Sequence, residues 1–160
     1  MILIKVGYSG SRDGMTKPQM RAVHGYLAYE LTVHDFDGAV IEFHHGDCLG
    51  GDAEAHVIAT VLGCRTVAHP PVNSRLRAYC KADEIREPKP YLTRDWDIAE
   101  ETGELLAAPK TAVPRQGSGT WATVGYGVEM GRPVTVFLPD GTAVPGQSFF
   151  GAPLPGRPAS

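Results

Sequence analysis

The sequence predicts a single α/β domain with a mostly parallel sheet of five strands and helices on both faces. Apolar segments rich in β-branched residues alternate with segments of helical periodicity along most of the chain, which is typical of right-handed βαβ units. The first of these segments, 2–8, is apolar except at Lys5, as expected for a parallel strand buried on both faces. A length of 160 residues with 42% hydrophobic content is enough for one core.

The first half of the chain is expected to contain three strands and two helices. The helical segments have apolar residues at roughly helical spacing, Pro18 suits an early helical position, and Gly63 suits a helix C-terminus. Pro70 and Pro71 end the third apolar segment. In order, the predicted elements are strand 2–8, helix 16–33, strand 38–44, helix 52–62 and strand 65–69.

The second half begins with a basic segment, 72–90, which has little periodicity and contributes either a lid over a ligand or a dimer interface. Thr93 suits the N-cap of the next helix. The predicted elements are helix 93–102, strand 104–109, helix 119–130 and strand 133–138. The domain therefore covers residues 1–139.

Residues 140–160 form a Gly/Pro-rich tail that we expect to be irregular. The tail contains one pair of large apolar side chains, Phe149-Phe150, which we expect to pack on the body of the domain or on a second subunit. We accordingly expect a homo-oligomer.

Composition narrows the functional classes. The net charge is −3 and like charges do not cluster, so nucleic-acid binding is disfavoured. The three cysteines lack C-x-x-C spacing, which favours a reducing compartment over a disulfide framework. Neither a signal peptide nor a membrane span is apparent. We predict a cytoplasmic protein.

Three glycine-rich turns carry the functional prediction, because each follows an apolar strand and precedes a helix. Backbone N–H groups at such helix starts are free to bind anions, with the positive end of the helix dipole behind them. In a parallel sheet, all three turns lie at the carboxyl edge, where ligands bind. The predicted ligand-binding residues are Gly10, Ser11, Arg12, Gly46, Gly50, Gly51, Gly117, Ser118, Gly119, Thr120 and Thr123.

Charged residues near these turns are the candidates for chemistry. The planar guanidinium group of Arg12 can donate two parallel hydrogen bonds to a phosphate. Arg94 stands near a helix start, where a cation is unfavourable to the dipole, so it either serves the site or forms an ion pair with Asp97 or Glu100. Asp47 and Asp52 flank the second turn; each is either an N-cap or a group that binds ribose or acts as a general base.

A metal site is the alternative for His44, His45, Asp47 and His56. Consecutive strand residues point to opposite faces, so one site would recruit only one member of the histidine pair. We therefore predict neither a metal nor a cofactor.

The order and spacing of these motifs over residues 2–139 resemble the SLOG superfamily, which includes LOG-type phosphoribohydrolases and DprA recombination mediators. The resemblance rests on Gly10-Ser11-Arg12, His45-Gly46-Asp47 with Gly51-Asp52-Ala53, Arg94-Asp95 and Gly117-Ser118-Gly119-Thr120. It implies a Rossmann-like sheet that binds nucleotides or nucleotide-derived ligands. It also implies that the turn at 117–120 holds a phosphate.

The chain departs from the LOG-type motif P-G-G-x-G-T-x-x-E at its end. Aligned on Gly119-Thr120, the glutamate that assists glycosidic cleavage falls on Thr123. Either Asp47 or Asp52 replaces it, with Arg94 assisting, or the protein binds its ligand without turnover. The prediction is nucleotide binding, with a nucleotide N-glycosidase as the alternative.

Overall fold

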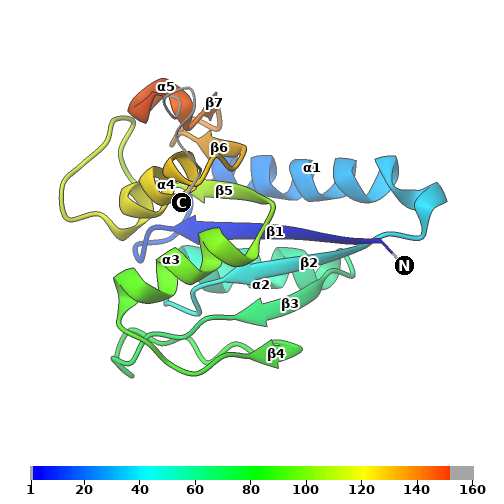
Figure 1. Ribbon diagram of the computed structural model, residues 1–160, viewed down its shortest axis with the longest axis horizontal. Coiled ribbons are helices and arrows are strands. Elements are labelled where there is room, and N and C mark those ends of the chain that lie inside the picture. The colour runs from blue at the N-terminus through cyan, green and yellow to red at the C-terminus, as the bar shows by residue number, and fades with distance from the viewer. Residues whose placement is uncertain (1, 152–160) are drawn as a thin grey trace.

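The fold is built on one seven-stranded sheet with the strand order β4-β3-β2-β1-β5-β6-β7. The computed structural model describes residues 2–151, and β1 lies at the centre of the sheet (Figure 1). The strands are β1 (Leu3–Gly10), β2 (Val40–His45), β3 (Arg65–Ala68), β4 (Glu84–Ile85), β5 (Glu104–Ala108), β6 (Val134–Phe137) and β7 (Ala143–Pro145). All neighbouring strands pair in parallel except β6 and β7. This confirms the α/β class with a mostly parallel sheet.

Helices cover both faces of the sheet. They are α1 (Lys17–Val33), α2 (Gly51–Val61), α3 (Tyr91–Glu101), α4 (Gly119–Glu129) and α5 (Gln147–Phe150), with a short 3-10 helix at Asp35–Asp37. Helix α1 begins with a capping box in which Thr16 accepts from the Gln19 backbone and the Gln19 side chain accepts in return. Gly63 follows α2 with a φ of 84°, the left-handed conformation expected of a helix-ending glycine.

Two hydrophobic cores result, one on each face. On the side of α1 and α2, Tyr8 and Phe43 belong to one buried cluster. On the side of α3 and α4, Ile98 and Trp121 belong to the other. Gly7 allows α3 to approach β1, because a Cβ there would lie 2.7 Å from Thr102 Oγ1.

The predicted count of five strands is wrong, because two short edge strands complete the sheet. Strand β4 lies within the basic segment that lacked periodicity, and β7 lies within the predicted irregular tail. Edge strands of two or three residues are too short to show a hydrophobic period. The tail also forms α5, whereas its residues 152–160 lie outside the described part of the chain.

Helix α3 begins earlier than predicted. Pro90 is its N-cap, so Thr93 lies inside the helix and Arg94 is its fourth residue. No helix within residues 2–151 is long and apolar enough to cross a membrane.

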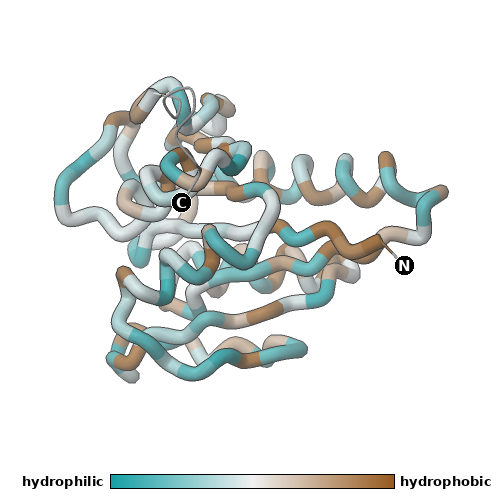
Figure 2. The backbone as a smooth tube through the Cα atoms, viewed as in Figure 1, coloured by the Kyte–Doolittle hydropathy of each residue, from teal (hydrophilic) through white to brown (hydrophobic). Residues whose placement is uncertain are grey.

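The strand order places a topological switch between β1 and β5. The chain proceeds from β1 to β2 and β3 on one side, then returns to β5 and β6 on the other. Ligands bind outside the carboxyl ends of the strands at such a switch. Figure 2 shows hydrophobic residues in the first half of β1 and near-neutral ones at its carboxyl end, so the strand is polar enough there to line a binding site.

Candidate functional site at the carboxyl edge of the sheet

A cavity of about 350 Å³ lies at this switch. The turn after β1, Gly46 after β2, the start of α3 and the turn into α4 form its walls. Ten of the predicted site residues line it: Gly10, Ser11, Arg12, Gly46, Asp52, Arg94, Gly117, Ser118, Gly119 and Thr120. The structure thus brings together turns that lie about a hundred positions apart in the sequence.

The turn into α4 has the geometry of an anion-binding helix start. Gly117 adopts a φ of 84°, which a glycine tolerates best. The Oγ of Ser118, the N-cap, accepts a hydrogen bond from Trp121 N at 3.2 Å. The first N–H groups of a helix have no acceptor within it, so those of Gly119 and Thr120 are available to a ligand.

The glycine turn after β2 packs against the glycine turn after β1. Gly51 N donates to Ser11 O at 2.8 Å, which places the start of α2 against the turn after β1. A Cβ on Gly50 would collide with the carbonyl of Arg12, and one on Gly51 would lie 2.9 Å from the Tyr8 hydroxyl. Gly50 and Gly51 therefore permit close packing, and neither lines the cavity.

Arg94 lies at the base of the cavity and is only 6% exposed. Its Nη1 donates to the carbonyl of Gly46 and to His69 O at 3.3 Å. Its Nε is 2.9 Å from Asp95 Oδ1. Gly46 must be a glycine for this packing, because a Cβ would overlap the guanidinium. The predicted ion pair with Asp97 or Glu100 is wrong, because Arg94 pairs with Asp95, the adjacent residue.

Two buried carboxyl groups accompany Arg94. Burial raises the pKa of Asp52 to about 6 and that of Asp95 to about 7, although Arg94 opposes both shifts. Asp52 Oδ2 accepts from Cys48 N at 3.1 Å, while its buried Oδ1 makes no hydrogen bond within residues 2–151. Both groups line the cavity, and at these pKa values each is partly protonated close to neutral pH.

Asp47 has a different role from the one predicted. Its Oδ2 accepts from Arg77 Nε at 2.9 Å, and its Oδ1 accepts from Cys80 N at 2.8 Å. The carboxylate holds the segment that precedes β4 and does not line the cavity. Thr123 is also outside the cavity wall, because it is fully buried and donates to Gly119 O at 2.8 Å.

Sequence reasoning missed several cavity residues. Besides Asp95, these include the cations Lys110 and Arg115 and the ring of Tyr91. Lys110 is 2.6 Å from Asp13 at the rim. No periodic signal marks such residues, since they lie in loops or on a helix whose start was misplaced. Arg12, Lys110 and Arg115 thus place three cations on the cavity wall, of which Lys110 is paired with Asp13.

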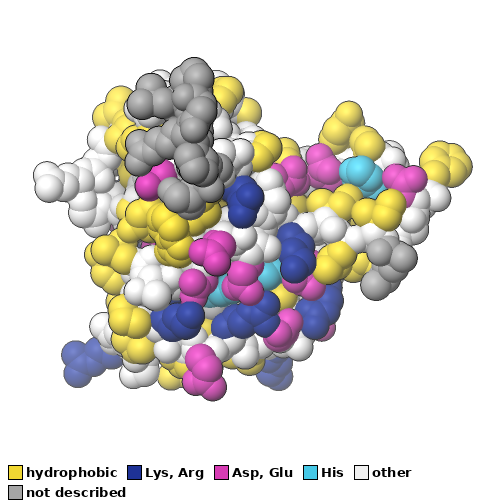
Figure 3. Space-filling model, viewed as in Figure 1, with side chains coloured by type: hydrophobic (Ala, Val, Ile, Leu, Met, Phe, Trp, Pro, Cys, Tyr) yellow, Lys and Arg dark blue, Asp and Glu magenta, His cyan; other side chains and the backbone are white. Residues whose placement is uncertain are grey.

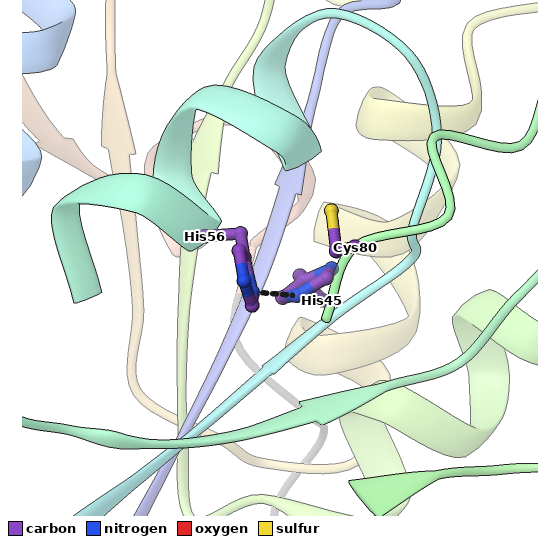
Figure 4. Close-up of side chains that lie close together, drawn as sticks. All are labelled: His45, His56 and Cys80. Carbon is purple, nitrogen blue, oxygen red and sulfur yellow. Dashed lines mark hydrogen bonds between the residues drawn. The ribbon is translucent and has the colours of Figure 1, made fainter. Parts of the chain in front are cut away.

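The histidines of the metal hypothesis separate onto the two faces of β2, as predicted. His45 Nε2 lies 3.0 Å from His56 Nδ1 on the face covered by α2, near Cys80 (Figure 4). His44 lies on the other face, with its Nδ1 2.8 Å from His69 Nε2.

No protein-family model matches the sequence, and no curated protein sequence matches it. Solved structures do match. A molybdenum cofactor binding protein from the phototrophic bacterium Rippkaea orientalis is 14% identical with a TM-score of 0.65, over 86% of this chain and 78% of that one. DprA from Streptococcus pneumoniae is 22% identical with a TM-score of 0.57, over 84% and 50%. DprA from Helicobacter pylori, which binds single-stranded DNA, is 18% identical with a TM-score of 0.53, over 83% and 64%.

At these identities the similarity shows the fold. The chain is an α/β protein with the Rossmann-like fold found in these structures.

Proposed function

We propose that the protein binds a nucleotide or nucleotide-derived ligand in the cavity between β1 and β5. The ligand class comprises nucleoside monophosphates, ADP-ribose and signalling nucleotides, with a phosphate at Gly117–Thr120. The observation that carries the proposal is that the glycine turns 10–12 and 117–120 face one cavity whose rim bears Arg12, Lys110 and Arg115. Backbone N–H groups and guanidinium groups both favour phosphate.

The cavity has room and chemistry for more than an inorganic ion. A volume of about 350 Å³ is at the lower end of small-molecule sites. The ring of Tyr91, at the start of α3, provides an apolar wall close to Gly119. A phosphate at the α4 turn would thus have a ribose or base beside it.

The first experiment identifies the ligand. Freshly purified protein is denatured, and the supernatant is analysed by mass spectrometry for nucleotides. Binding of nucleoside monophosphates, NAD and ADP-ribose is then measured by calorimetry. A retained nucleotide, or binding of one member of this panel, supports the proposal; the absence of both contradicts it.

The phosphate position is tested by substitution at Gly119. The Gly119→Asp variant should lose ligand binding, because its carboxylate would occupy the anion site. The matched control is Gly119→Ala, whose Cβ would lie 3.5 Å from the nearest atom, Asp95 Oδ2, an ordinary contact. The control should bind normally. Normal binding by Gly119→Asp would place the phosphate elsewhere.

Hydrolysis of the N-glycosidic bond is the second candidate function, favoured by the two buried carboxyl groups on the cavity floor. A carboxyl group with a pKa near 6 or 7 can donate a proton to a leaving base or accept one from water. Asp52 remains a candidate for the role of the missing glutamate, and Asp95 joins it. Release of free base with time would establish this activity, and Asp52→Asn and Asp95→Asn would identify the contributing group.

A further inference from the structure

Outside the candidate nucleotide site, two histidine clusters lie on opposite faces of β2. One ligand atom from each of His45, His56 and Cys80 lies within 4.8 Å of the others, and the same holds for His44, His69 and Glu101. Both clusters therefore have the spacing of metal ligands. Their hydrogen bonds distinguish them.

The first cluster has a donor for every acceptor. Asp47 N donates to His45 Nδ1 at 3.0 Å, so the proton of neutral His45 is on Nε2 and is donated to His56 Nδ1. The remaining N–H of His56 faces Thr60 Oγ1 at 3.5 Å. A metal on His45 Nε2 would require a proton on Nδ1, directly opposite the Asp47 N–H. This arrangement opposes metal binding by His45.

The second cluster has two hydrogen bonds and a third, longer contact that lacks a proton. Glu42 Oε1 lies 2.8 Å from His44 Nε2, His44 Nδ1 lies 2.8 Å from His69 Nε2, and His69 Nδ1 lies 3.5 Å from Glu101 Oε2. Two neutral imidazoles supply two protons for these three contacts. These two protons satisfy the two 2.8 Å hydrogen bonds, so at the longer contact the lone pair of His69 Nδ1 faces the Glu101 carboxylate unless a further cation is bound.

We propose that His44, His69 and Glu101 bind a divalent transition-metal ion, for which Zn²⁺ is the best match. Two imidazoles and a carboxylate are ligands that Zn²⁺ accepts in sites with an open position. The cation replaces the missing proton and takes up the lone pairs of the cluster.

The surroundings of His44 support the proposal. Its Nε2–H donates to the buried carboxylate of Glu42, which leaves Nδ1 as the ligand atom. A carboxylate that holds the distal N–H of a histidine is the usual support of a metal ligand. Arg65 Nη1 lies 3.5 Å from Glu42 Oε2 and helps to hold this carboxylate in place.

The cluster is also accessible from solvent. His44 and His69 are buried, at 0% and 3% exposure, whereas the Glu101 side chain is 35% exposed. A cavity of about 460 Å³ lies beside His69 and Glu101, and its other charged walls are the acids Glu87, Asp97 and Glu100 and the cations Arg86, Lys89 and Arg94. Arg86 Nη2 donates to Glu101 Oε1 at 2.9 Å, so Oε2 is the oxygen that faces His69. In Figure 3, a small area of histidine (cyan) is visible on this face, surrounded by acidic (magenta) and basic (dark blue) side chains. An ion can enter here, and a water or small ligand can complete its coordination.

The test measures Zn²⁺ binding by the full chain after treatment with EDTA and dialysis. Competition with a chromophoric chelator gives the affinity, and metal analysis after desalting gives the stoichiometry. One ion per chain is expected, together with a higher melting temperature. The His69→Gln variant should lose the ion. The Glu101→Gln variant should bind it about tenfold or more weakly. The fold should stay intact, because glutamine has the same shape and its carbonyl can still accept from Arg86 Nη2.

Two control variants and one spectrum make the assignment specific. Glu100→Gln changes the adjacent carboxylate and should leave the affinity unchanged, as should Cys80→Ser. The Co²⁺ form should lack a thiolate-to-metal charge-transfer band. Failure of wild-type protein to bind Zn²⁺ more tightly than His69→Gln would overturn the proposal. Loss of binding in Cys80→Ser alone would also overturn it, in favour of the other cluster. This proposal does not rest on the nucleotide site.

Discussion

Asp95 is the residue on which the electrostatics of the nucleotide site depend. Its Oδ1 is paired with Arg94 Nε at 2.9 Å, and its Oδ2 would lie 3.5 Å from a Cβ on Gly119, the residue that opens α4. An ionised carboxylate here would repel a phosphate at the turn, whereas a protonated carboxyl would donate to it. Because burial raises the pKa of Asp95 to about 7, both forms are populated near neutral pH.

Ligand binding should therefore weaken as the pH rises through about 7. The binding-competent form is the protonated one, so its fraction falls above the pKa, by at most about tenfold per pH unit. Calorimetric titrations of ADP-ribose at several pH values measure this, since its diphosphate does not titrate in that range. Asp95→Asn should lose the pH dependence centred near 7 and keep only the part that Asp52, with a pKa of about 6, contributes. An affinity for wild type that is constant across this range would contradict the role of Asp95.

The carboxyl groups also mark the limit of sequence reasoning at this scale. Asp47 and Asp52 flank the same turn and looked equivalent, yet only Asp52 reaches the cavity. Asp47 has a φ of 52° and binds Arg77 and Cys80, which lie about thirty residues further along. The sequence of the turn contains no information about partners so distant along the chain. The glycine turns were predictable because their chemistry is local.

At the scale of elements, the tail is anchored to the domain through α4 and α5. The ring centroid of Phe149, on α5, lies 4.9 Å from that of Trp121, on α4, with the planes at 68°. This edge-on geometry is favourable for aromatic pairs. The predicted docking of Phe149-Phe150 thus occurs on the body of the same chain. Trp121 is buried in the core and does not line the cavity wall.

Removal of the Phe149 ring should destabilise the whole domain. The Phe149→Ala variant loses a half-buried aromatic contact, which we expect to cost about 2 kcal/mol. Phe150→Ala is the control, because that ring is 46% exposed and lies further from Trp121, at 6.4 Å. Urea unfolding measures both variants. Equal, small losses would show that the tail adds nothing to the stability of the core.

Elements with a clear period were predictable, and those without one were not. Helices α1, α2 and α4 and the five long strands came within about two residues of their predicted bounds, because burial imposes a pattern on them. Helix α3 was misplaced at its start because Pro90 caps it without a side-chain hydrogen bond. Strands β4 and β7 depend on pairing at the sheet edge, which leaves no periodic trace in so few residues.

At the scale of the whole molecule, the charge distribution bears on which anions the chain can bind. Structural neighbours include a DprA protein that binds single-stranded DNA, but the chain spans 64% of its length and carries a net charge of −3. Tight binding along a nucleic-acid backbone requires several phosphate contacts by cations. The cations at the cavity rim surround a single recess, and one of them, Lys110, is already paired with Asp13.

We therefore predict that the protein binds a nucleotide but has little affinity for single-stranded DNA. Fluorescence anisotropy with a labelled oligonucleotide at about 50 mM and about 200 mM salt measures this. Any weak signal at the lower concentration should vanish at the higher one, because counterion release makes backbone binding strongly dependent on salt. The Gly119→Asp variant should give the same DNA result as wild type, since the cavity is too small for a strand. Tight binding at the higher salt concentration, lost in Gly119→Asp, would instead mean that the phosphate turn holds a nucleic-acid backbone.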